Sequence, residues 1–303
     1  MLTFLPPFLR IPLGFLILIA NTVLHCIPLF ALALLKLLLP LRAVRTLLSR
    51  VLILIAESWI AVNGFTFWLL TRIDWQVQGH DRLRYEGHYL VVSNHQSWVD
   101  IPVLQRTFNK EIPFLKFFLK QELIWVPVLG LAWWALDFPF MKRHSKEFLA
   151  KHPELKGKDL ETTRLACEKF RHVPVSVMNF VEGTRFTPAK HDSQQSPYTH
   201  LLKPKAGGVA FVLNAMGDIL QSIVDVTIHY PEGRPTFMDM LSGRLRKVQV
   251  LVRELPIPKD LLGGDYENDP AYRERFQRWL SDLWHEKDQL LARLSSAPAG
   301  AAA

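Results

Sequence analysis

Tyr89-Leu-Val-Val-Ser-Asn-His-Gln-Ser-Trp-Val-Asp100 is the stretch of sequence on which the predicted fold depends. It begins as a short run of β-branched and apolar residues, the pattern of a buried strand, and breaks at Ser93-Asn94. Ser97 then has the character of a helix N-cap, with Asp100 three residues later as its capping-box partner. The pattern therefore predicts a strand that ends at a turn and runs into a helix, with His95 on the turn.

Two interpretations of His95 and Asp100 are open at this point. In the first, Asp100 only caps the helix and His95 is an ordinary loop histidine. In the second, Asp100 accepts the Nδ1 proton of His95, which fixes the tautomer and leaves Nε2 free as a base. Residues five apart lie about 140° from each other around a regular helix, so the pair can meet only if His95 precedes the helix. The break at Asn94 allows that arrangement.

The composition favours a membrane surface over nucleic acid as the partner of this chain. Its 303 residues carry a formal net charge of +8, while 49% of them are hydrophobic, a combination that suits an anionic lipid surface. The sequence has no zinc-ligand spacing, RNA-binding signature or basic run interleaved with aromatics, so we expect no metal and no nucleic-acid partner. With only Cys26 and Cys167 present, a disulfide framework is excluded, which suits a reducing compartment.

The N-terminal region is apolar enough to enter a membrane. From Ile11 to Leu35 the sequence is almost wholly apolar, long enough for a span of about 20 residues. Arginines follow at positions 42, 45 and 50, against a lone Arg10 before the span, so the positive-inside rule places the rest of the chain on the cytoplasmic side. A second apolar segment, from Val51 to Leu70, favours a helix in the interface or within one leaflet. Residues 1–73 are therefore predicted to form a membrane anchor with interfacial helices.

A second strand also ends at polar residues. The run from Val173 to Phe186 is predicted as a strand followed by Glu182-Gly183-Thr184-Arg185. Gly183 lets the backbone approach a ligand closely, and Arg185 offers a planar fork suited to a phosphate. The competing interpretation is an ion pair between Glu182 and Arg185 on a surface turn.

A third candidate site precedes a predicted helix. After a polar loop at residues 187–199, the segment Lys203-Pro-Lys-Ala-Gly-Gly208 leads into an apolar helix from Val209 to Met216. Two lysines and two glycines at a helix N-terminus can bind an anion. A flexible helix entry with solvated Lys203 and Lys205 explains the same pattern.

Together the three sites carry the motifs of a known family. The first two follow strands, as expected of residues that converge at one edge of an α/β sheet. Asn94-His-Gln-Ser-Trp-Val-Asp100 matches the H-x4-D motif of the PlsC-type glycerolipid acyltransferases, and Phe180-Val-Glu-Gly-Thr-Arg185 resembles their F-P-E-G-T-R motif. Lys203-Pro-Lys-Ala-Gly-Gly208 is similar to the branch with the lysophospholipid and lysocardiolipin acyltransferases. Val181 stands where the family commonly has proline, which loosens the turn before Glu182. Asp225 also replaces a common proline, in a later block, and this puts the acceptor-side pocket in doubt.

The resemblance implies a fold and a chemistry. The expected fold is α/β, a mixed sheet flanked by helices as in glycerol-3-phosphate acyltransferase, with the membrane-embedded helical segment before it. His95 would be the general base, oriented by Asp100, with backbone N–H groups near the helix start stabilising the tetrahedral intermediate. Acyl-CoA or acyl carrier protein would serve as co-substrate, and we expect no cofactor. The expected substrate-binding residues are Glu182, Gly183, Thr184, Arg185, Lys203 and Lys205. Because Glu182 would repel phosphate, we expect it to orient Arg185 or to contact a hydroxyl.

The remaining segments complete the predicted domain organisation. An acyltransferase domain is expected over residues 74–255, with an amphipathic helix from Lys158 to Phe170. Residues 256–296 are predicted as a linker and an amphipathic helix that starts at Asp269-Pro270 and docks on the domain. Residues 297–303 are predicted to be disordered.

The sequence thus predicts a membrane-bound acyltransferase that acylates a lysophospholipid such as 1-acyl-sn-glycerol-3-phosphate. The expected partners are the lipid bilayer, the lysophospholipid acceptor and the thioester donor, and the expected location is a bacterial inner membrane with the catalytic domain on its cytoplasmic side. Two alternatives are open: a thioesterase or transacylase, and a non-catalytic lipid-binding membrane protein.

Overall fold

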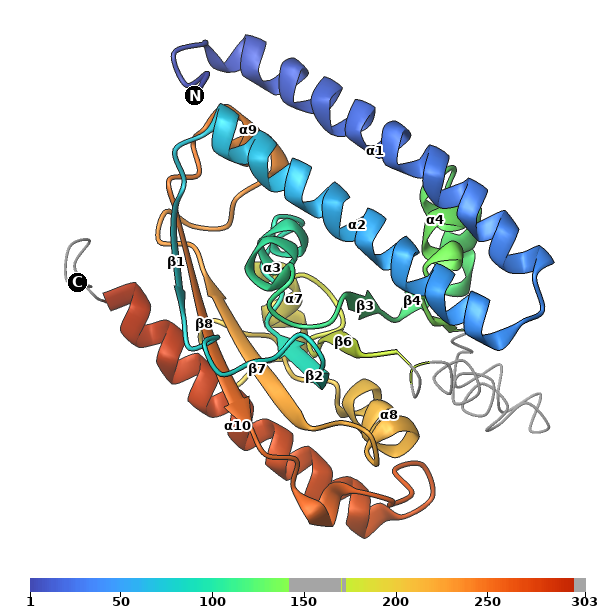
Figure 1. The fold of residues 1–303 in the computed structure, drawn as a ribbon. Coiled ribbons are helices and arrows are strands. Elements are labelled where there is room, and N and C mark those ends of the chain that lie inside the picture. The colour runs from blue at the N-terminus through green and yellow to red at the C-terminus, as the bar shows by residue number, and fades with distance from the viewer. Residues whose placement is uncertain (142–169, 171–172, 297–303) are drawn as a thin grey trace.

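A computed structural model gives the arrangement of the chain and describes residues 1–141, 170 and 173–296. Figure 1 shows three layers. Two long antiparallel helices, α1 (Pro7–Leu38) and α2 (Arg42–Leu70), form a hairpin that lies across one side of the molecule. A β-sheet lies beneath the hairpin, and the helices α8 (Ala206–Met216) and α10 (Pro270–Ser296) cover the opposite face of the sheet.

The central sheet is mixed, as predicted. Its strands in spatial order are β1 (Asp74–Gln78), β8 (Lys247–Leu255), β7 (Ser222–His229), β2 (His88–Ser93), β6 (Val175–Phe180) and β3 (Leu115–Phe117). The last four of these are parallel to one another, while β8 runs antiparallel to β7 and parallel to β1. The carboxyl ends of β2, β6 and β7 therefore lie side by side at one edge of the sheet.

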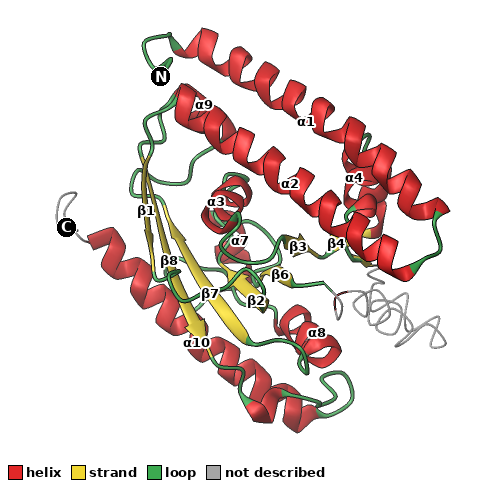
Figure 2. Cartoon of the chain, in the orientation of Figure 1, coloured by secondary structure: helices red, strands yellow, loops and turns green. Residues whose placement is uncertain are grey.

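Shorter elements connect the strands (Figure 2). They are α3 (Asp100–Phe108), β4 (Leu119–Lys120), the 3₁₀-helix η1 (Gln121–Trp125), α4 (Leu129–Ala135), β5 (Phe140–Met141), α7 (Pro188–Gln194), α9 (Phe237–Ser242) and the 3₁₀-helix η4 (Lys259–Leu261). Strands β4 and β5 pair separately from the main sheet.

Several boundaries differ from the prediction. The segment at 187–199 is not wholly a loop, because Thr187 Oγ1 accepts a hydrogen bond from Lys190 N–H (3.3 Å) and caps helix α7. Helix α3 begins at Asp100 rather than directly after Ser97. The predicted helix from Lys158 to Phe170 lies outside the described residues except for Phe170, and so does the tail at 297–303.

Strand β2 separates two apolar cores because its side chains alternate. Tyr89 and Val91 point into the core under the hairpin, which also contains Phe67 of α2 and the buried face of α3. Leu90 and Val92 point into the core on the other face, with α8 and α10. Burial on both faces explains why the strand is a continuous apolar run.

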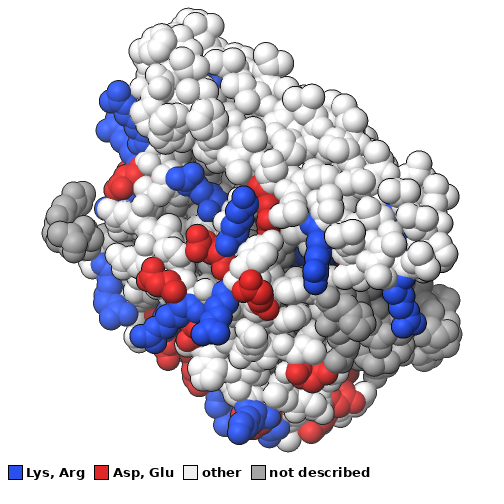
Figure 3. Space-filling model, viewed as in Figure 1, with Lys and Arg blue, Asp and Glu red and all other residues white. Residues whose placement is uncertain are grey.

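The hairpin presents a broad apolar surface on its outer side. Large side chains along α1 and α2 are exposed, and Figure 3 shows this part of the molecule almost free of charge, with Lys and Arg side chains along its border. Both helices are long and apolar enough to cross a membrane. Asn21 Nδ2 donates to Asn63 Oδ1 (2.8 Å) and Trp59 Nε1 donates to Thr22 Oγ1 (3.0 Å), which joins the two helices by polar contacts.

Contacts with the α/β unit hold both ends of α1. It packs against α9 near its start and against α4 near its end, where Lys36 Nζ forms an ion pair with Asp137 (2.5 Å). Helix α2 also packs on α3 and α9. The hairpin therefore lies along the domain, rather than projecting from it as a separate anchor.

A buried ion pair fixes the C-terminal helix to the sheet. Asp269 Oδ1 accepts hydrogen bonds from the N–H groups of Ala271 and Tyr272, which confirms the predicted helix start. Lys287 on α10 is fully buried, and its ammonium lies 2.6 Å from Asp225 Oδ1 on β7. Arg253 on β8 binds the other carboxylate oxygen at 2.7 Å. Asp225 thus anchors α10 to the sheet.

Removing one partner of this pair should destabilise the fold. We expect Lys287→Met to lower the free energy of unfolding by about 3 kcal/mol, because it leaves a buried carboxylate with only one of its two cations. Chemical denaturation followed by tryptophan fluorescence measures the change, with the exposed Lys259→Met as the matched control. The double variant Asp225→Leu/Lys287→Met should recover most of the loss. If the double variant is as unstable as the single one, the charge on Asp225 is not the cause.

Candidate active site

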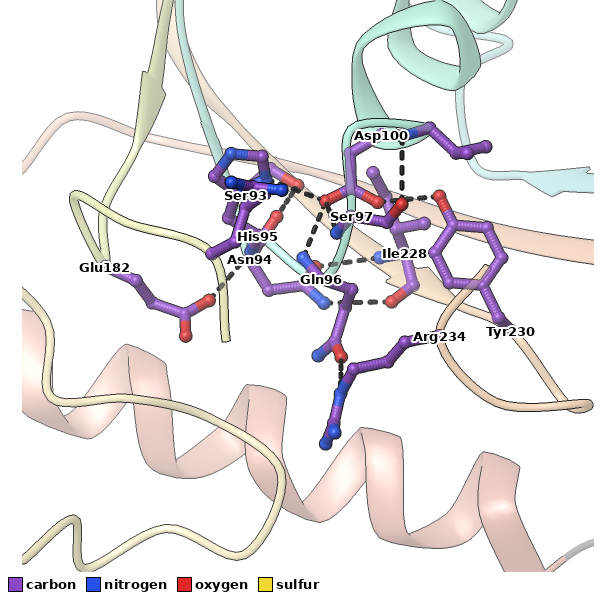
Figure 4. Close-up of polar contacts among 12 residues, drawn as sticks. Ser93, Asn94, His95, Gln96, Ser97, Asp100, Glu182, Ile228, Tyr230 and Arg234 are labelled. Carbon is purple, nitrogen blue, oxygen red and sulfur yellow. Dashed lines mark hydrogen bonds and ion pairs between the residues drawn. The ribbon is translucent and has the colours of Figure 1, made fainter. Parts of the chain in front are cut away.

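The His95 side chain meets Asp100 in the turn between β2 and α3. His95 Nδ1 lies 2.8 Å from Asp100 Oδ2, and Figure 4 shows the two side chains close together, with His95 on the turn after β2 and Asp100 at the first position of α3. Asp100 is fully buried, and the His95 side chain is only 12% exposed. The interpretation in which Asp100 orients His95 is therefore the one that the geometry favours.

Asp100 accepts further hydrogen bonds that keep its carboxylate in place. Oδ2 also accepts from the N–H groups of Gln96 (2.6 Å) and Ser97 (2.9 Å), and Oδ1 accepts from the Tyr230 hydroxyl (2.6 Å). Burial, together with the nearby Asp100 charge, raises the pKa of Tyr230 well above its usual value, so this hydroxyl keeps its proton and donates. With a carboxylate as acceptor, Nδ1 of His95 carries the proton and Nε2 is left as the basic nitrogen.

The predicted capping box at Ser97 is only partly present. Asp100 accepts the Ser97 N–H as expected, but Ser97 Oγ accepts from Val99 N–H (3.0 Å) rather than from Asp100 N–H. Ser97 Oγ itself donates to the carbonyl of Pro235, so the turn is held against the loop that follows β7. The N–H groups of Gln96 and Ser97 are occupied by Asp100, and the expectation that amides at the helix start stabilise an oxyanion is wrong for these two.

Two neighbouring strands fix the position of the His95 turn. The Asn94 side chain exchanges two hydrogen bonds of 2.9 Å with the backbone of Ile228 on β7. The ring of Phe180, at the end of β6, stacks on the imidazole with 3.8 Å between centroids and 11° between planes. Phe117 of β3 stacks in turn on Phe180 at 6.1 Å. The imidazole therefore has one face against an aromatic stack that leads into the apolar core beneath the hairpin.

Glu182 lies beside His95 but acts on the backbone. Its Oε1 accepts the N–H of His95 (2.7 Å) and its Oε2 accepts the N–H of Leu202 (2.8 Å). The side chain is fully buried, and burial raises its pKa to about 7 although both N–H groups favour the ionised form. The structure thus corrects two expectations: the carboxylate neither orients Arg185 nor faces an incoming hydroxyl.

Arg185 lies half-buried beside the His95 turn, with its guanidinium against Trp98. The group stacks 4.4 Å above the ring of Trp98, which is 57% exposed. Within the described part of the chain, this guanidinium makes no hydrogen bond or ion pair. The competing interpretation, a surface ion pair with Glu182, is therefore wrong. Arg185 keeps all its donors for a ligand.

Gly183, Thr184 and Lys205 lie together next to Arg185. Gly183 has φ = +68°, and a Cβ at this position would lie 3.0 Å from Cδ and 3.3 Å from Nζ of Lys205. The absence of a side chain therefore lets Lys205 lie across the turn. Thr184 Oγ1 accepts from Lys190 Nζ (2.7 Å), a lysine that the sequence did not single out. Two lysines, Lys190 and Lys205, thus lie at this turn together with Arg185.

Lys203 is not part of this arrangement. Its side chain is exposed, and only its backbone N–H is held, by Gln194 Oε1 at 3.2 Å. Lys203 and Lys205 are two positions apart in the motif, and of these two lysines the structure brings Lys205 to the glycine turn.

The sequence did not identify three residues that complete the site. Tyr230 and Arg234 come from the loop after β7, and Gln96 is the residue next to His95. Arg234 Nε donates to Gln96 Oε1 (2.9 Å), and its guanidinium stacks 3.8 Å from the Phe186 ring. In Figure 4 both side chains extend away from the imidazole. The β7 loop has no motif of its own, so only the pairing of β7 with β2 could have revealed its role.

The site contains an acid–base pair and cations, and no metal cluster. Among the residues that the structure describes, no three His, Cys, Asp or Glu side chains are placed to hold a metal ion. A histidine base with a fixed tautomer, next to an unpaired arginine, can remove a proton from a substrate that carries a negative charge.

Comparisons with known proteins agree with this chemistry. The model of the family described as Acyltransferase matches residues 74–231. The chain is 24% identical over 213 residues to human 1-acyl-sn-glycerol-3-phosphate acyltransferase delta, covering 66% of this chain and 51% of that protein. It is 25% identical over 217 residues to the mouse gamma enzyme, covering 67% and 52%. The chain thus spans about half the length of these curated relatives.

One solved structure is also similar. The crystal structure of the 1-acyl-sn-glycerophosphate acyltransferase PlsC from Thermotoga maritima aligns with a TM-score of 0.47 and 18% sequence identity. The alignment covers 91% of this chain and 98% of that one.

Titration of Glu182 should make the stability of the fold depend on pH. Its folded-state pKa of about 7 is above the ordinary value of 4.5, so between these values the folded protein binds more protons than the unfolded chain. The free energy of unfolding therefore falls as pH rises through this window. Glu182→Gln, which cannot titrate, should lack this fall of about 2 kcal/mol.

Denaturation of wild type and Glu182→Gln at about pH 5 and about pH 8 measures the effect. The other titrating groups contribute equally to both proteins, so they cancel when the two free energies of unfolding are subtracted at each pH. At the lower pH both proteins carry a neutral side chain at this position. From the lower to the higher pH, wild type should lose stability relative to Glu182→Gln, because only wild type must ionise a buried carboxyl. An equal difference at both pH values would contradict a raised pKa of Glu182.

Proposed function

The chain belongs to the Acyltransferase family, which confirms the resemblance drawn from its two motifs, and we propose that it transfers a fatty acyl group from a thioester donor to the free hydroxyl of a lysophospholipid. One observation carries the proposal: a histidine with a fixed tautomer lies near an arginine that has no hydrogen-bond or ion-pair partner among the described residues. The His95–Asp100 pair suits deprotonation of a hydroxyl, and Arg185 suits the phosphate of the acceptor. The curated relatives are named for acyl transfer to 1-acyl-sn-glycerol-3-phosphate, which supports this acceptor.

The proposed reaction uses His95 twice. Nε2 accepts the proton of the acceptor hydroxyl as its oxygen attacks the thioester carbonyl carbon. Asp100 holds the Nδ1 proton and stabilises the imidazolium that forms. When the tetrahedral intermediate collapses, the C–S bond breaks and Nε2 returns the proton to the leaving thiolate.

One backbone amide of the His95 turn is available for the developing oxyanion. Since Gln96 and Ser97 bind Asp100, the Trp98 N–H is the amide of this turn that has no partner among the described residues. Donors fixed where charge develops stabilise a transition state strongly.

The acceptor phosphate is assigned to the cations around the glycine turn. Arg185 offers two parallel N–H groups, while Lys205 lies over Gly183, two residues before Arg185 in the chain. Because Thr184 binds Lys190, it contributes by holding that cation near Arg185. Lys203 is left for the phosphates of the donor, which we propose to be acyl-CoA or acyl carrier protein, with no cofactor. The similarity of this segment to the lysocardiolipin branch stays a prediction.

We also propose that the hairpin is embedded in one leaflet. The exposed apolar face of α1 and α2 supports insertion, and the contacts of both helices along the α/β domain disfavour a perpendicular crossing. In this arrangement the basic first part of α2, residues 42–50, and the catalytic domain lie on the same side of the membrane. The positive-inside rule then favours the cytoplasmic side, as in a bacterial inner membrane.

His95→Ala should abolish transfer without unfolding the protein. A positioned general base contributes about 10²–10⁴-fold, so kcat/KM should fall at least by that factor. Product analysis with thioester donor, with and without lysophospholipid, measures transfer and detects hydrolysis separately, and circular dichroism reports the fold. Asp100→Asn should also lose turnover, because an amide cannot stabilise the imidazolium as a carboxylate does. Wild-type turnover by folded His95→Ala, or thiol release that needs no acceptor, would refute the proposal.

Arg185→Lys should weaken acceptor binding specifically. A lysine cannot form the two parallel hydrogen bonds of a guanidinium, so kcat/KM for the lysophospholipid should fall roughly ten- to a hundred-fold. The KM for the donor should change little. Arg275→Lys is the matched control, since Arg275 also stacks on an aromatic ring, that of Tyr272, but lies on α10 and outside the site. A defect confined to the donor KM would move the acceptor phosphate to another cation.

A further inference from the structure

A cavity rich in arginine lies at the open end of the helical hairpin, away from the catalytic residues. It has a volume of about 540 Å³ and lies between the N-terminal segment, the first turn of α1, the link from α2 to β1 and the link from α9 to β8. Its lining residues include Phe4, Arg10, Arg72, Gly243 and Arg246. We call the three arginines and the cavity between them the arginine pocket.

The arginine pocket carries a positive charge that its walls do not neutralise. Three guanidinium groups line it, and no Asp or Glu is among its lining residues. The side chains of Arg72 and Arg246 are exposed and make no hydrogen bond or ion pair within the described ranges. Asp239, on the neighbouring helix α9, is paired with Arg244 at 3.1 Å. Converging cations without a counter-charge favour an anionic ligand.

The position of Arg10 is fixed before any ligand binds. Its Nη1 donates to the carbonyl of Leu70 at the end of α2 (3.2 Å), and its Nε is buried without a partner. The guanidinium lies against Gly243, which ends α9 with φ = +77°, and a Cβ there would lie 2.7 Å from Nη1. A glycine at this position thus leaves the space that the guanidinium occupies. A cation held in this way loses little conformational entropy on binding an anion.

The surroundings of the arginine pocket are apolar. Phe4 is 77% exposed and Phe8 is 73% exposed, and both lie at the start of the hairpin. In Figure 3 the border of the uncharged hairpin surface carries Lys and Arg side chains. A ligand here meets cations and exposed apolar side chains together, which suits a molecule with a phosphate and hydrocarbon chains.

We propose that the arginine pocket binds the phosphate of an anionic phospholipid of the bilayer, with the lipid chains lying along Phe4 and Phe8. This site is separate from the acceptor site, since neither His95 nor Arg185 lines it. The two sites face the same edge of the sheet, because Arg246 directly precedes β8, which pairs antiparallel with β7. A lipid held at this point would orient the active site toward the membrane surface. The proposal does not depend on acyl transfer.

The test measures lipid binding by full-length protein in detergent. An Arg185→Gln background removes the proposed acceptor phosphate site. Calorimetric titration uses dihexanoyl phosphatidylglycerol below its micelle concentration, with dihexanoyl phosphatidylcholine and inorganic phosphate as parallel ligands. Arg72→Gln/Arg246→Gln is the pocket variant. The control, Lys259→Gln/Arg293→Gln, removes the same charge from two exposed residues on the α10 side of the sheet, which the hairpin does not cover.

We expect a single saturable site for phosphatidylglycerol in the background and control proteins. In the pocket variant the affinity should fall roughly 25-fold, since each basic residue near an anionic lipid contributes about five-fold. Phosphatidylcholine should bind much more weakly. Equal phosphatidylglycerol affinity in the pocket variant and the control would overturn the site. Inorganic phosphate that binds as tightly as phosphatidylglycerol, and is lost in the pocket variant, would overturn the lipid assignment and make this a free-phosphate site.

Discussion

The buried carboxylate of Asp100 holds together the parts of the structure that matter for its chemistry. One oxygen accepts from His95 and from two amides of the turn before α3, and the other accepts from the Tyr230 hydroxyl beyond β7. A buried charge is tolerated only with such a set of donors, because its desolvation otherwise costs several kcal/mol. The same bonds that make the charge tolerable also set the tautomer of the imidazole. Stability and reactivity therefore depend on one group, and the loop after β7 is as necessary as the motif that contains the histidine.

A second buried carboxylate, that of Glu182, also accepts hydrogen bonds from the backbone, and it lies in the turn after strand β6. It joins the backbone of the His95 turn to Leu202, just before the segment that places Lys205 over Gly183. The positions of His95 and Lys205 are therefore linked through one side chain. Arg185 remains outside this network and rests on Trp98. The site thus combines a buried histidine held from several sides with a half-buried arginine that makes no hydrogen bond among the described residues.

Much of this arrangement could be predicted from the sequence because the signals are local. The apolar run before Asn94 and the change to polar residues at its end identified β2 and placed His95 outside α3. The Asp269-Pro270 pair identified the start of α10, since cap and proline act within one turn. The contacts of Glu182, Tyr230 and Arg234 were not predictable in this way. Each depends on which strands become neighbours, and β6 and β7 flank β2 although long stretches of chain separate them. The ionic partner of Asp225 could not be predicted from the sequence for the same reason, because Lys287 lies on a helix whose sequence pattern indicates only an apolar face.

The Lys287–Asp225 pair has a consequence for the order in which the protein is made. Chains emerge from the ribosome N-terminus first, so the apolar hairpin is made before any strand of the sheet. Strand β7 emerges with an aspartate on its core face, and Arg253 on β8 supplies the first cation. The second cation arrives only with α10, after every strand of the sheet has been made. The face of the sheet that α10 covers therefore stays open to water until this helix has been synthesised and docks on it.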